Sequence, residues 1–220
     1  MRHRFLLFVT VFTLVYSAAA QLPGQNYNKI GISGGYLFSN IETNDLPISA
    51  GNGYTVGLET RGSYSKTLDF IYAITFYNTQ VELQTVDILA DPEVMATQTM
   101  SQQSVQLQFL ASLNLIRHHL SIEAGPAVAV QGKFKTDNEL QEDFAIAGYT
   151  LSRVSDLRDL STIDFRLVGG LTFGIEPVRI SLLYIRGMTN TLNALNGTTP
   201  EFDDLKGNNS ILALRGIIYL

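Results

Sequence analysis

The chain contains no cysteine in its 220 residues. This absence excludes a disulfide framework, a thiolate nucleophile, a cysteine-based zinc site and a lipid-modified N-terminal cysteine. Charged residues are also scarce, at 16% of the chain, and the net charge is −5. After the N-terminal region, no apolar run approaches the roughly 20 residues that a transmembrane helix needs. A membrane crossing by this part of the chain would therefore have to use strands.

The N-terminus has the pattern of a cleavable secretory signal. Arg2 and Arg4 form a basic start, an apolar stretch runs from Phe5 to Tyr16, and small residues at 18–20 precede Gln21. The alternative, a membrane-spanning helix, is disfavoured because this apolar stretch is too short. We expect three parts: a cleaved signal (1–20), a short N-terminal segment on the periplasmic side (21–28) and one β domain (29–220).

Eight stretches of the remaining chain alternate bulky apolar side chains with small or polar ones. In the first, Ile30, Ile32, Tyr36 and Phe38 share one face. A period of two predicts β-strands whose two faces meet different surroundings. Pro126 predicts a bulge or bend in its strand, because proline cannot donate to the ladder. The predicted strands are Lys29–Phe38, Tyr54–Tyr64, Leu68–Val81, Ser104–Leu115, Leu120–Gln131, Ile163–Gly174, Val178–Gly187 and Ser210–Leu220.

The connections between these strands alternate strictly in length. Outer-membrane barrels have short periplasmic turns and longer external loops. We therefore predict an all-β fold: a single eight-stranded antiparallel up-and-down transmembrane barrel in the outer membrane, with both termini periplasmic. The predicted long loops are 39–53, 82–103, 132–162 and 188–209, and the short turns are 65–67, 117–119 and 176–177.

A soluble, exported barrel of the lipocalin type is the alternative fold, because alternation alone does not say which face is buried. The membrane form is favoured by small polar-face residues, by the loop asymmetry, and by aromatic residues near the strand ends. These aromatic residues are Phe38, Tyr54, Phe76, Phe165 and Tyr184 at the external end, and Tyr64, Phe70 and Phe173 at the periplasmic end.

Seven charged residues fall on the faces that would line the barrel interior. Charges sealed in a narrow core must be paired, because each unpaired one costs several kcal/mol. We therefore predict an internal salt-bridge network in a closed polar core. The alternative is a proton or ion path, or a gate. The seven residues are Glu59, Arg61, Asp69, Glu123, Arg166, Arg179 and Arg215.

Catalytic, cofactor and metal sites are not indicated. His118 and His119 are the histidines left after signal cleavage, and both fall in a predicted periplasmic turn without a third ligand. The glycines of Gly31–Gly35 lie along a predicted strand that leads to no helix, unlike a phosphate-binding loop. We predict a non-enzymatic protein with no catalytic, cofactor-binding or metal-binding residue and no cofactor.

Acidic residues are concentrated in the predicted long loops, which hold fifteen acids and five bases, whereas the strands and short turns hold five and eight. An acidic exterior argues against nucleic acid as a partner. Clustered oxygens can bind divalent cations, although a solvated acidic loop is the commoner case. The apolar run Asp143–Leu151 could order its loop or contact a partner. The acidic clusters are Asp87, Asp91 and Glu93 in one loop, and Glu201, Asp203 and Asp204 in another.

With these strands in place, the chain resembles the PorT-like family of outer-membrane β-barrel domain proteins. The resemblance lies in the segments Lys29–Gly35, Gly53–Gly57, Glu123–Ala127 and Val168–Gly174 and in the strand that runs to the C-terminus. The ending Tyr219-Leu220 departs from the terminal phenylalanine of such barrels. The resemblance implies a barrel fold and an outer-membrane location. It also implies that some relatives take part in type IX secretion, and it offers no catalytic residues.

The leading functional hypothesis is a structural or partner-binding protein of the outer membrane that acts through its external loops. The partner would belong to the envelope, for example to a secretion or surface assembly, and the chain is expected to be a monomer. The alternative is a narrow channel or small-solute transporter. A lipid-modifying enzyme of the outer membrane and a soluble lipocalin-like carrier come third.

Overall fold

The computed structural model describes residues 28–87, 94–117, 119–136, 144–158 and 160–220. Almost all regular structure is β-strand, because the alternating residues favour pleated, half-buried surfaces. Among the described residues, no helix has both the length and the apolar character needed to cross a membrane. The main strands are β1 (Asn28–Glu42), β2 (Ile48–Ser63), β3 (Leu68–Asp87), β4 (Val94–Ile116), β5 (Leu120–Gln131), β8 (Ile163–Ile175), β9 (Val178–Gly187) and β10 (Asn208–Tyr219).

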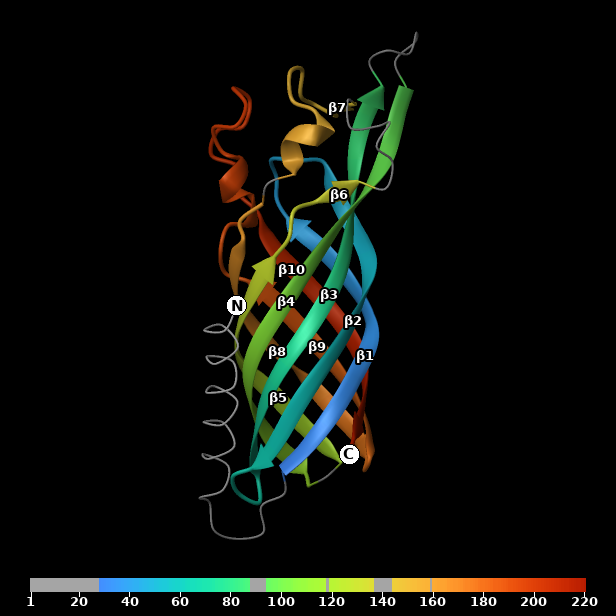
Figure 1. Ribbon diagram of the computed structural model, residues 1–220, viewed down its shortest axis with the longest axis vertical. Coiled ribbons are helices and arrows are strands. Elements are labelled where there is room, and N and C mark those ends of the chain that lie inside the picture. The colour runs from blue at the N-terminus through green and yellow to red at the C-terminus, as the bar shows by residue number, and fades with distance from the viewer. Residues whose placement is uncertain (1–27, 88–93, 118, 137–143, 159) are drawn as a thin grey trace, which may run out of the picture.

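These eight strands form a closed antiparallel ring, which we call the barrel (Figure 1). Neighbours in sequence pair around it, and β10 closes the ring against β1, with Gly35 opposite Arg215. The predicted antiparallel strands in up-and-down order are thereby confirmed. Three short connections, 64–67, 117–119 and 176–177, lie at one end of the barrel, called the turn end.

The barrel has an apolar outside and a polar inside. On β4, Leu107 is 61% exposed, whereas its neighbours Gln106 and Gln108 are buried. The same alternation follows the other strands; on β1, Phe38 is 54% exposed and Leu37 is buried. The apolar face therefore points outward, which is the reverse of a soluble lipocalin-like barrel.

Beyond the barrel, at the end opposite the turns, the chain folds into a second layer that we call the cap (Figure 1). It consists of the connection 43–47, the extended ends of β3 and β4, and the described residues of the long connections after β5 and β9. The first of these connections holds β6 (Lys135–Thr136), β7 (Ala145–Ile146) and the 3₁₀ helix η2 (Val154–Leu157). The second holds the 3₁₀ helix η3 (Thr191–Leu195).

Two of the four predicted long loops are wrong. Most of 39–53 belongs to β1 and β2, which are joined by the short connection 43–47, and most of 82–103 belongs to β3 and β4. In both places the strands continue past the apolar band, where the outward residues are polar, so the run of outward apolar residues that marked the strands ends there. The long connections after β5 and β9 are confirmed.

Of the bulge or bend predicted at Pro126, the bulge is wrong, although the β4–β5 pairing is interrupted at Phe109 and Leu110, opposite Pro126 and Gly125. Gln108 lies opposite Ala127 and Ala111 opposite Ala124, so the β4–β5 register is the same on both sides of the proline. The register shifts near Asn114 instead. Pro126 pairs with Leu167 of β8, and its missing N–H costs β5 a donor without adding a residue.

Candidate functional site

A network of buried charges fills the barrel interior near the turn end. Its centre is the guanidinium group of Arg61 on β2, which forms ion pairs with Glu123 of β5 and, at 3.4 Å, with Asp69 of β3. The same group donates hydrogen bonds to the hydroxyl oxygens of Ser112, at 2.9 Å, and Tyr219, at 3.0 Å. Residues from five strands therefore meet at one cation, which ties opposite walls of the barrel together.

Two further arginines extend this network. Arg215 of β10 forms an ion pair with Glu59 at 3.7 Å, and Glu59 also accepts a hydrogen bond from the hydroxyl of Tyr219. Arg179 lies over the Tyr219 ring, 5.9 Å from its centroid, and 4.0 Å from a carboxylate oxygen of Glu176. Arg61 and Arg215 therefore each pair with a buried acid, as a buried cation requires, whereas Arg179 has only the 4.0 Å contact with the partly exposed Glu176 and no hydrogen bond to the described residues.

All seven charges predicted to line the interior are buried there, so the internal salt-bridge network is confirmed. Asp164 was not among the predicted interior charges, and it pairs with Arg166 at 2.8 Å and accepts a hydrogen bond from Asn209 at 3.0 Å. The alternation along this strand could have predicted that Asp164 points into the interior, since it lies between the outward residues Ile163 and Phe165. With Asp164 the interior holds four buried acids and four buried arginines.

Apolar side chains occupy the interior between the turn-end network and the cap. They form one buried cluster that includes Leu37, Leu110, Val168, Leu183 and Ile185. Buried polar side chains lie in the same interior, and among them Gln106 accepts a hydrogen bond from Arg166 at 3.0 Å and donates one to Gln108 at 2.9 Å.

The cap has a hydrophobic core of its own, separate from the barrel interior. This core joins segments that lie far apart in the sequence, so it ties the long connections to one another and to the extended strands. The run Asp143–Leu151 orders its connection in this way from residue 144 onward, and Asp143 lies outside the described residues. The cap core comprises Ile41, Leu46, Val81, Leu83, Met100, Phe134, Ile146, Val154, Leu157, Leu160, Leu192, Leu195, Phe202 and Leu205.

Glu201 clamps the two long connections of the cap together. Its carboxylate accepts hydrogen bonds from the backbone N–H groups of Thr150, Leu151 and Ser152, at 2.8–3.0 Å, and from the Ser152 hydroxyl at 2.8 Å. Partial desolvation acts to raise the Glu201 pKa, but these hydrogen bonds outweigh it and hold the pKa below the ordinary glutamate value. The acid is therefore a structural clamp in its ionised form.

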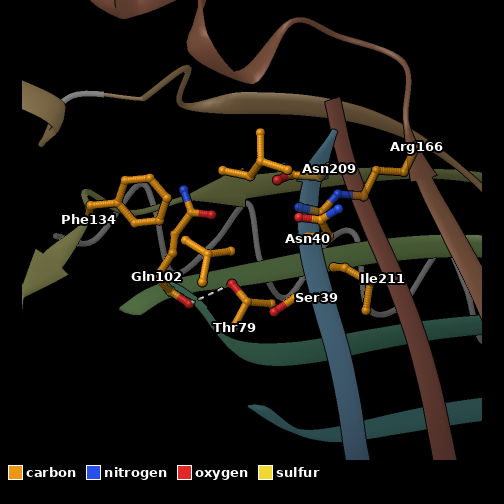
Figure 2. Close-up of a pocket in the computed structure, with 10 residues that line it drawn as sticks. Ser39, Asn40, Thr79, Gln102, Phe134, Arg166, Asn209 and Ile211 are labelled. Atoms are coloured by element: carbon orange, nitrogen blue, oxygen red, sulfur yellow. Dashed lines mark hydrogen bonds between the residues drawn. The ribbon is translucent and has the colours of Figure 1, made fainter. Parts of the chain in front are cut away.

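A small cavity with both polar and apolar lining lies where the barrel interior meets the cap (Figure 2). Ser39, Asn40 and Asn209 line it, together with Arg166 and Gln102, and the Thr79 hydroxyl beside it donates a hydrogen bond to the Gln102 carbonyl at 3.2 Å. It has room for about one water molecule. This volume excludes an organic ligand at this position.

The other residues considered from sequence do not meet in a site. His119 is exposed and its ring nitrogen contacts the Arg117 carbonyl at 2.8 Å, while His118 lies outside the described residues. Asp204 forms an exposed ion pair with Lys206 at 2.6 Å. In the described part of the chain, acids and histidines form no cluster able to hold a metal ion. Asp91 and Glu93 also lie outside the described residues.

No family model and no curated protein matches the sequence, so the PorT-like resemblance stays a prediction. Among solved structures, the chain is similar to neisserial surface protein A, with 10% identity and a TM-score of 0.48 over 89% of this chain and 99% of that one. It is also similar to Ail, the attachment invasion locus protein of Yersinia pestis, with 15% identity and a TM-score of 0.45 over 88% and 99% of the two chains. Because both TM-scores are below 0.5, these likenesses assign no function.

Proposed function

We propose that the chain is a non-enzymatic outer-membrane protein: a closed barrel that anchors a folded external cap, which binds a partner in the envelope or at the surface. The observation that carries this proposal is the inverted barrel, apolar outside and charged inside. A surface of this kind is stable in hydrocarbon, where each backbone group must find its partner within the closed sheet.

The dimensions of the outward apolar band support the membrane placement. On β4 this band runs from Val105 to Leu115, roughly 34 Å along the strand at about 3.4 Å per residue. A strand tilt of about 40° reduces this to roughly 25 Å, the height of the apolar band in outer-membrane barrels. The outward residues beyond the band, towards the cap, are polar and not buried: Asn52, Asn78, Gln103, Arg186 and Ser210.

The filled interior favours an anchor over the channel alternative. Three of the four arginines in the described interior, Arg61, Arg166 and Arg215, pair with buried acids, and buried apolar and polar side chains fill the barrel between the turn-end network and the cap. The cap adds a second packed layer over the mouth of the barrel. Function then falls to the cap, because it is the folded part that would face the outside.

Labelling of single cysteines in intact cells tests this proposal, since the natural chain has none. We expect Lys206→Cys, in the cap, to react with a membrane-impermeant maleimide in intact cells. Lys66→Cys, in an exposed turn at the other end, should react only after the outer membrane is permeabilised. The reverse pattern, or equal labelling of both before permeabilisation, would contradict the proposed orientation.

A further inference from the structure

Arg179 and Arg215 are buried arginines whose N–H groups lack acceptors. Both side chains are 1% exposed. All three guanidinium nitrogens of Arg179, and Nε and Nη1 of Arg215, have no hydrogen-bond partner among the described residues. In the same interior, by contrast, Arg61 and Arg166 each donate at least two hydrogen bonds. A buried donor without an acceptor is costly, most of all on a charged group, so an acceptor is expected at these two arginines.

The acids nearest to the two arginines do not supply this acceptor. Glu59 lies 3.7 Å from Arg215, and it already accepts a hydrogen bond from a tyrosine hydroxyl. Glu176 lies 4.0 Å from Arg179, forms a closer ion pair with Lys29 and is partly exposed. Both contacts with the arginines are longer than a hydrogen bond. Each carboxylate therefore attracts its arginine without satisfying the guanidinium N–H groups.

The two arginines share one patch of the inner wall. In the β9–β10 ladder, Arg215 lies opposite Ser181, and Arg179 lies opposite Ile217. Arg179 and Arg215 are therefore diagonal neighbours on the inward face, about 7–8 Å apart at the backbone and within reach of each other's long side chains. Two buried cations at this spacing repel each other more strongly than they would in water. An anion between them would remove this repulsion.

Ser181 adds a further donor to the patch. Its side chain is fully buried, and its oxygen accepts a hydrogen bond from the Thr172 hydroxyl at 3.0 Å. Because a hydroxyl can accept and donate at once, the Ser181 hydrogen is still available to an acceptor. Ser181 lies directly opposite Arg215 and two residues from Arg179 on the same face of β9. Three side chains therefore present donors to one place.

The surroundings of the patch limit the ligand to a small ion. The burial of both guanidinium groups leaves no approach for an organic molecule. Arg179 comes two residues after the turn 176–177, so the patch lies near the turn end. At this rim the side chains of Lys29 and Glu176 are 20% and 34% exposed, so the aqueous phase reaches the edge of the patch.

We propose that Arg179, Arg215 and Ser181 bind one small inorganic anion, of the size of chloride, inside the barrel near the turn end. The anion accepts charge-assisted hydrogen bonds from both guanidinium groups and a hydrogen bond from the serine. The site lies at the opposite end of the barrel from the cap. It therefore goes beyond the proposed function and does not depend on it.

The test is urea unfolding of the protein in lipid vesicles, with potassium chloride replacing potassium gluconate at constant ionic strength. Gluconate is an organic anion too large for the buried patch. A ligand that binds the folded state alone raises the folding equilibrium constant in proportion to its concentration above the dissociation constant. We expect a rise of about tenfold for each tenfold increase in chloride in the natural protein, and no such dependence in Arg179→Gln. Arg186→Gln, at an exposed arginine, is the matched control and should keep the natural dependence.

A second arm leaves the protein unchanged, so it decides the matter even where Arg179→Gln does not fold. Crystals of the natural protein grown with bromide in place of chloride should show the anomalous signal of one bromide ion beside the guanidinium groups of Arg179 and Arg215. Water alone at that position would overturn the inference. A natural protein whose stability ignores chloride would also overturn it, as would Arg179→Gln with the natural chloride dependence, since a purely structural role of Arg179 predicts that result.

Discussion

Arg61 illustrates how a single residue holds the barrel interior together. Its guanidinium contacts side chains from four other strands, and it is buried with the acids that it neutralises. Removing a buried charge leaves its partner charges unpaired in a medium of low dielectric. This loss costs more free energy than the ion pair itself contributes to stability. The contribution of Arg61 to stability is therefore measured by the cost of leaving its partner carboxylates without a cation.

We predict that Arg61→Met lowers the free energy of unfolding by about 3–5 kcal/mol, because Glu123 and Asp69 lose their cation. The measurement is urea unfolding of the protein in lipid vesicles. Arg186→Met is the control, since its ion pair with Glu42 is exposed and should change stability by about 0–1 kcal/mol. Equal losses for the two variants would show that the interior network is not a stabilising centre.

Glu201 gives the cap a dependence on pH whose sign follows from its pKa. The folded-state pKa lies below the ordinary value of 4.5, so the ionised carboxylate adds stability that is fully present above pH 4.5. That stability is lost as the pH falls below 4.5 and through the folded-state pKa, where protonation removes the acceptor for the amides at 150–152.

We predict that hydrogen-exchange protection of the amides of Thr150, Leu151 and Ser152 falls as the pH is lowered from 7 to below 4.5, after correction for intrinsic exchange rates. In Glu201→Gln the same amides should be weakly protected at every pH. Amides of β9 serve as the internal control and should stay protected throughout. Unchanged protection at 150–152 at low pH would show that the ionised carboxylate does not hold the two connections.

At the scale of the elements, the pairing of β1 with β10, which closes the barrel, depends on a close approach of the two backbones. A Cβ atom on Gly35 would lie 2.1 Å from the Leu214 carbonyl oxygen, closer than such atoms can approach. The adjacent Gly34 points outward, and a Cβ there would have its nearest neighbour at 3.8 Å. The two glycines therefore differ in role although they are neighbours in one strand.

We predict that Gly35→Ala destabilises the barrel by about 1–3 kcal/mol, the usual cost of overpacking, while Gly34→Ala leaves stability nearly unchanged. Heat-modifiable gel migration measures the fraction that folds, and urea unfolding measures the stability. Equal behaviour of the two variants would mean that the β1–β10 contact can widen without cost.

The cap is a folded element because its own core is well packed. Phe202 is 1% exposed and meets Tyr149 edge-to-face, with ring centroids 5.6 Å apart. We predict that Phe202→Ala removes about 3–5 kcal/mol from the packing of the cap. Limited proteolysis should then cut the long connections faster while the barrel keeps its heat-modifiable migration. Leu151→Ala, at a 65% exposed position, should change neither property.

The sequence predicted the barrel well and the cap poorly, for a physical reason. The predicted bounds of β5 and β9 agree with the structure, because both strands lie within the apolar band where polar and apolar faces contrast. Leu83 and Met100 are buried in the cap core, but their strands carry polar residues on the outward face there, so residues 82–103 were predicted as a loop. Contacts such as Leu192 with the distant cap segments leave no local signal in a single sequence.

At the scale of the whole molecule, the interior and the cap together should close the barrel to ions. We predict no stable open-channel current in planar bilayers, because an eight-stranded barrel is only wide enough for its side chains to fill, and buried side chains occupy the described interior below the cap. A porin inserted in the same bilayer is the positive control. Large, steady conductance steps would contradict the filled interior and support the channel alternative.

The most direct test of the account is a nitroxide scan of β4 in lipid vesicles, with single cysteines placed from Thr97 to Leu115 of the cysteine-free chain. We predict that nitroxides at odd positions from 105 to 115 collide freely with oxygen, and that nitroxides at even positions are shielded. Nitroxides at odd positions from 103 towards the cap should instead collide with a water-soluble nickel complex. Contact between the nickel complex and the odd positions 105–115 would contradict a barrel whose apolar outer face lies in lipid.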